Sequence, residues 1–222
     1  MERFRNLLVG LAGSSADAGL IGYAELLVRL STFKEVRFLR IVAPKPEGTA
    51  SPDHGQIVAE MESKVASVFG DAPRAFRIAC DVAKGPLLDR FLQFAVEQNT
   101  DLILVGHQPE HAGRAALARR LTMKAPCSIL MRPDPAPARL ARILAPIDFS
   151  NHSADSLRVA SGMARRAGPK CLPLHVRLHR IVVAEEHLKQ KIAYEDLSHI
   201  PRDREVAYFQ DFVKNIPDLD VV

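Results

Sequence analysis

The apolar residues of this chain switch repeatedly between short continuous runs and longer stretches at helical spacing. Short continuous runs are typical of buried strands, whereas intervals of three and four residues indicate amphipathic helices. The pattern predicts strands over 5–12, 36–44, 75–81, 101–106 and 127–133, and helices over 14–30, 53–70, 85–100 and 113–124.

Strands that alternate with helices predict a parallel sheet covered on both faces, because parallel neighbours need crossover connections. We therefore expect an α/β domain over residues 1–133, built on a doubly wound, parallel five-stranded sheet. Residues 134–138, DPAPA, are short, stiff and without periodicity, which is typical of a linker.

The pattern starts again after this linker. ARILAPIDFS at 141–150 is similar in kind to NLLVGLAGS at 6–14, and Ser-Ala-Asp follows both. We interpret residues 139–222 as a second, incomplete copy of the domain, truncated after its third strand begins. Its predicted elements are strands over 143–148 and 170–178 and a helix over 202–215.

The second copy lacks any counterpart of residues 85–133. In a doubly wound sheet the fourth strand pairs with the first, so strand 143–148 would have a bare apolar edge. We expect this chain to be part of a longer protein, or another chain to supply the missing strand.

Composition excludes several classes of protein. No apolar run approaches the roughly 18 residues that span a bilayer, and charges interrupt the first residues where a secretory signal would be apolar. We expect a cytoplasmic protein without membrane contact.

Cys80, Cys127 and Cys171 are too scattered for a disulfide framework or a zinc site, and are predicted to be buried, inert thiols.

The formal charge of +4 is mild, and the basic residues lie among 26 acidic ones. Nucleic acid is therefore not an expected partner. The densest basic segment, GRAALARRLTMK at 113–124, is interpreted as a solvated helix face, with a phosphate contact as the alternative.

Asp148 ends the predicted strand 143–148, and Ser150 and Asn151 follow it. Ligands of open parallel sheets bind beyond the carboxyl ends of the strands, where a carboxylate can accept hydrogen bonds from a ribose or an adenine amine. The alternative is a turn and capping network without a ligand. The equivalent position in the first copy is Ala12, whose side chain accepts nothing.

Other motifs of catalysis are weak. The glycines of GLAGSS and VGHQPEHAG are isolated and form no phosphate-binding loop, and no GxSxG nucleophile motif follows a strand. His107 and His111, like His175 and His179, are four residues apart, but no carboxylate or cysteine at matching spacing completes a metal site. We expect neither an enzyme nor a metal protein.

The segments ILAPIDFS, LHV, DLILVG and APCSILM together resemble the universal stress proteins (Usp) of the tandem-domain type. The resemblance covers the whole chain, as one full domain and the first part of another. It implies the sheet described above, which is of the adenine nucleotide alpha hydrolase-like kind.

The ATP-binding members of that family carry an aspartate after the first strand and a glycine loop after the fourth. In this chain Ala12 replaces the aspartate, and only Gly106 matches the loop, whose second glycine falls on Pro109. The degenerate loop Gly106, His107 to Gly113 instead resembles the universal stress protein A subgroup, which does not hold ATP in this way. The resemblance implies a first domain without nucleotide.

The resemblance also implies that the fifth strand pairs across a dimer or between tandem halves. The second half has no fifth strand, so residues 128–132 are predicted to join their counterpart in a homodimer. The preferred hypothesis is a non-enzymatic cytoplasmic stress-response protein without a cofactor, acting by self-association or with unknown protein partners. The alternative is a regulator that binds ATP or AMP at Asp148 and Ser150 and hydrolyses ATP slowly.

Overall fold

A computed structural model describes residues 4–43, 53–70, 74–107, 119–140, 143–167 and 202–217. The chain divides into two compact units, Met1–Arg139 and Leu140–Val222. Each unit is described by itself.

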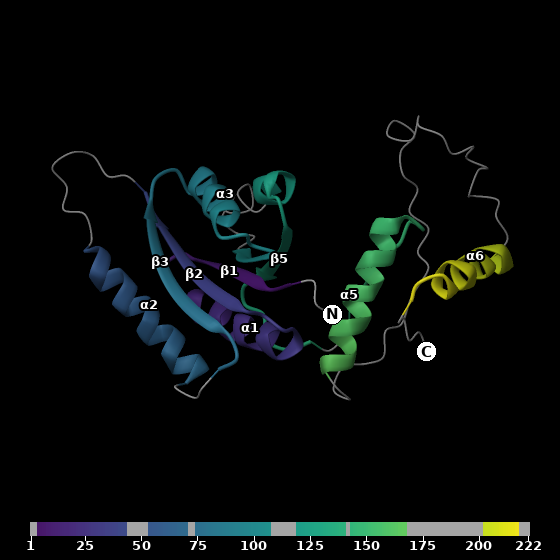
Figure 1. Cartoon of the computed structure of the whole chain (residues 1–222), viewed down its shortest axis with the longest axis horizontal. Coiled ribbons are helices and arrows are strands. Elements are labelled where there is room, and N and C mark those ends of the chain that lie inside the picture. Colours follow the sequence, from purple (N-terminus) through teal and green to yellow (C-terminus); the bar gives the residue numbers. More distant parts are fainter. Residues whose placement is uncertain are drawn as a thin grey trace. The chain divides into compact units, whose positions relative to one another are not determined.

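Unit 1 contains a five-stranded sheet in the order β3-β2-β1-β4-β5, and every neighbouring pair is parallel (Figure 1). The chain moves outward from β1 to β3 on one side, then returns to add β4 and β5 on the other. This is the doubly wound α/β topology that the sequence predicts. The strands are β1 (Asn6–Leu11), β2 (Glu35–Val42), β3 (Arg77–Lys84), β4 (Leu102–His107) and β5 (Ser128–Pro133).

Helices cover both faces of the sheet (Figure 1). One face packs on α3 (Leu87–Glu97), where Leu8 of β1 and Phe91 share one buried cluster. On the other face, which α1 (Asp17–Leu30) and α2 (His54–Phe69) cover, the ring of Phe38 meets that of Phe69 edge-on, with centroids 6.0 Å apart. Strand side chains alternate between the faces, and because both faces are covered, β1 and β4 are mainly apolar, whereas β2 also carries Glu35, Arg37 and Arg40.

The helix and strand ends differ from the prediction by a few residues. Helix α2 begins and ends as expected, because the Asp53 carboxylate accepts a hydrogen bond from the Gly55 amide and Gly70 adopts a φ of 68°. Helix α1 begins at Asp17, after a turn in which the Asp17 amide donates to the Ser14 carbonyl. The cap residue is Ala16, and no side chain caps this end of the helix.

Unit 2 contains α5 (Asn151–Ala167) and α6 (Arg202–Lys214) in its described part, and α6 confirms the helix predicted over 202–215. Leu157 and Ile216 are central to their small apolar cluster. The predicted strand over 143–148 was wrong, because these residues form no strand. A strand requires a hydrogen-bonded neighbour, and the described residues of this unit offer none.

The segment 143–148 nevertheless keeps a strand-like alternation. Ile143, Ala145 and Ile147 pack against the cluster around Leu157. Leu144 is 75% exposed, whereas its counterpart Leu8 in unit 1 is fully buried. The segment therefore has one apolar side that α5 covers.

Several predicted features lie outside the described residues: the strand 170–178, the chain end 218–222, Cys171, Gly113, and the histidines at 111, 175 and 179. Two interpretations stay predictions: that the second copy is a truncated domain, and that the domain boundaries are 1–133, 134–138 and 139–222. Among the described helices, none is long and apolar enough to cross a membrane.

Candidate functional site

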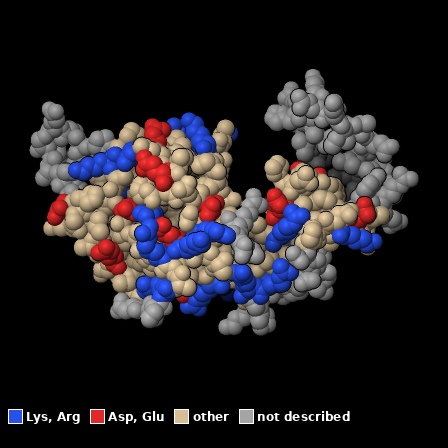
Figure 2. All heavy atoms as spheres, viewed as in Figure 1, with Lys and Arg blue, Asp and Glu red and all other residues tan. Residues whose placement is uncertain are grey.

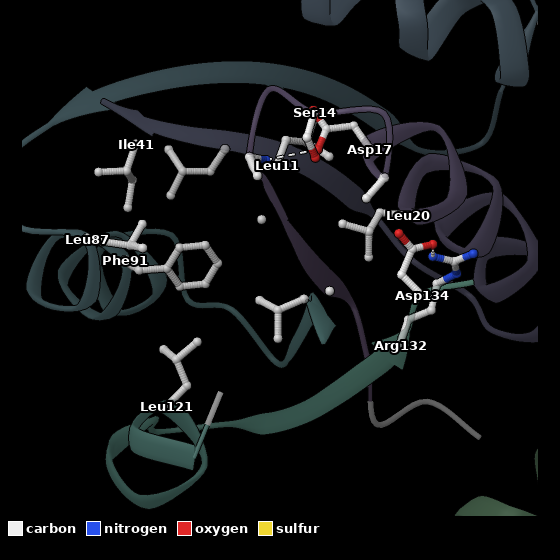
Figure 3. Close-up of a pocket in the computed structure, with 16 residues that line it drawn as sticks. Leu11, Ser14, Asp17, Leu20, Ile41, Leu87, Phe91, Leu121, Arg132 and Asp134 are labelled. Carbon is white, nitrogen blue, oxygen red and sulfur yellow. Dashed lines mark hydrogen bonds and ion pairs between the residues drawn. The ribbon is translucent and has the colours of Figure 1, made fainter. Parts of the chain in front are cut away.

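A cavity of about 290 Å³ lies in unit 1 at the carboxyl ends of β1 and β4. The sheet order reverses between these two strands, which is where open parallel sheets place their ligands. Its walls are mainly apolar, and Leu11, Leu20, Phe91 and Leu121 point into the same space (Figure 3). Each wall comes from a different element, so the cavity depends on the packing of the whole unit.

Asp17 occupies one end of the cavity (Figure 3). It is 2% exposed, and its two carboxylate oxygens accept hydrogen bonds from the amides of Ala12 and Gly13, both at 2.9 Å. These amides follow β1 and precede the amino end of α1, a position that favours negative charge. An internal carboxylate therefore already holds the donors that a phosphate would use.

Arg132 and Asp134 lie together at another side of the cavity (Figure 3). Arg132 is 6% exposed and donates to Asp134 at 3.4 Å and to the Ala136 carbonyl. Its guanidinium lies against Gly19 of α1, where an added Cβ would come within 2.5 to 2.7 Å of it. Burial raises the pKa of Tyr23, and the Arg132 charge opposes this rise. Arg132 thus ties the end of β5 to α1 and to the residues that follow.

Two polar atoms of the cavity residues are buried without a hydrogen-bond partner among the described residues: the Ser14 hydroxyl oxygen and Nε of Arg132. Buried polar groups are normally paired, so each such atom calls for an explanation.

The residues of the degenerate loop separate in the structure. Gly106 lines the cavity, and a Cβ added there would lie 3.4 Å from Leu20 Cδ1. His107 is the last residue of β4, so it belongs to the strand and not to the loop predicted after it. Gly113 lies outside the described residues.

Asp148 and Ser150 lie in unit 2 and form a turn ahead of α5. The Ser150 amide donates to Asp148 Oδ1 at 3.0 Å, and the Ser150 hydroxyl oxygen accepts from the Ser153 amide at 3.2 Å. Hydrogen bonding by the Ser150 side chain and amide lowers the pKa of Asp148. This geometry is the turn and capping network that the sequence left open, and Asp148 is exposed.

Strand β5 forms one edge of the sheet and pairs with β4. The Ser128 amide donates toward β4, to the Asp101 carbonyl at 3.2 Å. Because successive strand amides point to opposite sides, the amides of Ile129 and Met131 point away from β4, toward the edge that pairs with no described strand and is here named the open edge. Met131 is 42% exposed, so this edge also presents apolar surface.

Two cysteines are described, and both are free and partly buried, where buried thiols were expected. Burial raises the pKa of Cys80 to about 11, and burial also raises the pKa of Cys127. Both are therefore thiols at neutral pH, the less reactive form.

Charges of both signs are interspersed over the visible face of unit 1 (Figure 2). Arg37 pairs with Glu35 and with Asp81, both within 2.9 Å. In the basic segment, Arg119, Arg120 and Lys124 are exposed. Among the described residues no three His, Cys, Asp or Glu side chains are grouped to hold a metal ion.

Sequence reasoning missed three contributors to the cavity: Asp17, Ser14 and Arg132. Asp17 had a local signal, since an acid five residues beyond a strand end can fold back onto the loop amides. Arg132 also had one, a single charge in the apolar run SILMRP. Ser14 had none, because its importance depends on burial.

No family model and no curated protein matches this chain. Similar solved structures include those of universal stress proteins. One, a complex with cAMP, is 14% identical with a TM-score of 0.46 and covers 59% of this chain and 98% of its own. One from Archaeoglobus fulgidus is 14% identical with a TM-score of 0.44, covering 58% and 98%. One from Arabidopsis thaliana with AMP bound is 15% identical with a TM-score of 0.41, covering 60% and 93%.

Proposed function

We propose that this chain is a non-enzymatic, cytoplasmic stress-response protein of the universal stress type, which acts by self-association through β5 and through partner proteins. The sequence resemblance over the first domain and the doubly wound sheet support this proposal. The free thiols Cys80 and Cys127 are in keeping with a reducing compartment.

The residues after β1 disfavour ATP in unit 1. Ala12 has no side-chain acceptor for a ribose, and its amide is bonded to Asp17. A triphosphate would have to displace this buried carboxylate and approach its negative charge. We therefore expect unit 1 neither to hold nor to hydrolyse ATP.

The single observation that carries the proposed association is the open edge of β5. An edge strand with free amides and an exposed apolar side chain is a template for another strand. Two copies of one strand can meet across a two-fold axis, which makes the contact self-complementary. Apolar burial at Met131 and backbone hydrogen bonds would both favour such a dimer.

The proposal is tested by changing Met131 to Pro. This removes an amide that faces the open edge and leaves the hydrogen bonds to β4 in place. The wild-type chain should be a dimer at micromolar concentration in sedimentation velocity, and Met131→Pro a monomer with unchanged circular dichroism. Met131→Leu keeps the amide and the apolar surface, so it should remain dimeric. A monomeric wild-type chain, or a Met131→Pro variant that still dimerises, would refute association through β5.

A further inference from the structure

The cavity of unit 1 combines an apolar wall with very few free polar groups. Leu11, Leu20, Phe91 and Leu121 face its centre (Figure 3). A cavity of roughly 150 Å³ with such a lining can hold benzene. At about 290 Å³, the cavity has room for a molecule of about twice that size.

The charged side chains of the lining disfavour an anion. Asp17 and Asp134 are negative and Arg132 is positive, which leaves a net charge of minus one among these residues. The two amides that attract anions are already bonded to Asp17, and the Arg132 guanidinium donates to Asp134 and the Ala136 carbonyl, which leaves its Nε without a partner among the described residues. A nucleotide phosphate or a carboxylate would therefore meet repulsion with little compensation.

The Ser14 hydroxyl provides a polar anchor at the end of the cavity beside Asp17 (Figure 3). Its oxygen is buried and has no partner in the described part of the chain. A ligand with one hydroxyl or amine group would satisfy it, whereas a fully apolar ligand would leave it unpaired.

We infer that this cavity is a binding site for a small, uncharged, mainly apolar molecule of bicyclic aromatic size, with one hydrogen-bonding group directed at Ser14. This goes beyond self-association, because it assigns unit 1 a ligand of a class different from nucleotides. Binding would bury apolar surface on both partners and supply Ser14 with its missing hydrogen bond.

The experiment is isothermal titration calorimetry of 1-naphthol into the full chain at pH 7, where this probe is neutral. We expect saturable binding with a dissociation constant on the order of 10 to 100 µM. The anion 1-naphthoate has nearly the same shape and should bind at least about 10-fold more weakly. ATP should not compete with 1-naphthol.

Three variants locate the site. Gly106→Val adds bulk toward Leu20 and should abolish binding, while Ser14→Ala should weaken it about 3- to 10-fold. Ser31→Ala is the matched control, because Ser31 also has a buried, unpartnered hydroxyl oxygen but does not line the cavity, and its affinity should be unchanged.

No saturable binding of 1-naphthol, equal binding of 1-naphthoate, or equal losses in Ser14→Ala and Ser31→Ala would overturn the inference. If Gly106→Val does not fold, the two serine variants still decide it. Sedimentation of the same samples keeps this test separate from the dimer, because Ser14 and Gly106 are not on the open edge of β5.

Discussion

The carboxylate of Asp17 takes the place that a bound anion occupies at the start of many helices. It accepts two amide hydrogen bonds while remaining 2% exposed. Such charge-assisted hydrogen bonds contribute more to stability than neutral ones do. Removing the acceptor leaves the two amide donors to be satisfied by water. This one side chain therefore closes the loop after β1, and we expect it to disfavour a phosphate there.

We predict that Asp17→Ala lowers the free energy of unfolding of unit 1 by about 2 to 3 kcal/mol, measured by urea denaturation. Asp53→Ala is the matched control. Its carboxylate is exposed and accepts from the Gly55 amide at the start of α2, so its loss should cost about 1 kcal/mol. Equal losses in the two variants would mean that Asp17 is an ordinary helix cap.

At the scale of elements, α1 is fixed to the end of β5 by the contact of Arg132 with Gly19. An alanine at position 19 would place its Cβ 2.7 Å from the guanidinium carbon. Arg132 cannot easily move away, because it is buried and bonded to Asp134 and the Ala136 carbonyl. The glycine is thus required by packing, although a helix interior ordinarily disfavours it.

Substitution by alanine at two glycines of α1 should consequently change the stability of unit 1 in opposite directions. Gly22→Ala meets only the Ala138 side chain at 3.9 Å and should stabilise unit 1 by about 0.5 to 1 kcal/mol. Gly19→Ala should instead destabilise it by about 1 to 2 kcal/mol, since Arg132 must shift. In an Arg132→Ala background the Gly19→Ala loss should disappear, and chemical denaturation of the four proteins measures this coupling. Stabilisation at both positions would show that Arg132 moves freely.

The elements of unit 1 could be predicted because their signals are local. β1, β4 and β5 are continuous apolar runs, and α2 lies between Asp53 and Gly70. The predictions that failed concern features that depend on residues distant in the sequence. Residues 143–148 have the same apolar pattern as β1 but form no strand, since pairing depends on a neighbour that the pattern does not specify. Likewise, the orientation of Arg132 toward Gly19 could not be predicted, because it depends on the packing.

At the scale of the whole molecule, the resemblance to universal stress proteins leaves two functions open, association or adenine-nucleotide binding. The described residues of each unit offer a nucleotide little. In unit 1, Asp17 holds the amides after β1. In unit 2, Asp148 accepts from the Ser150 amide, and the residues before it form no strand whose carboxyl end could define a site.

We therefore predict that neither ATP nor AMP binds the full chain more tightly than about 1 mM in isothermal titration calorimetry. The same titrations of Asp148→Ala and of Asp155→Ala, a half-buried acid of α5 with the same change in charge, complete the experiment. Saturable binding lost only in Asp148→Ala would favour the nucleotide-binding regulator, because it would mean that the turn at Ser150 opens to a ribose or an adenine. Binding that persists in both variants would direct attention to unit 1, where Asp17 would have to release the Ala12 and Gly13 amides to a phosphate.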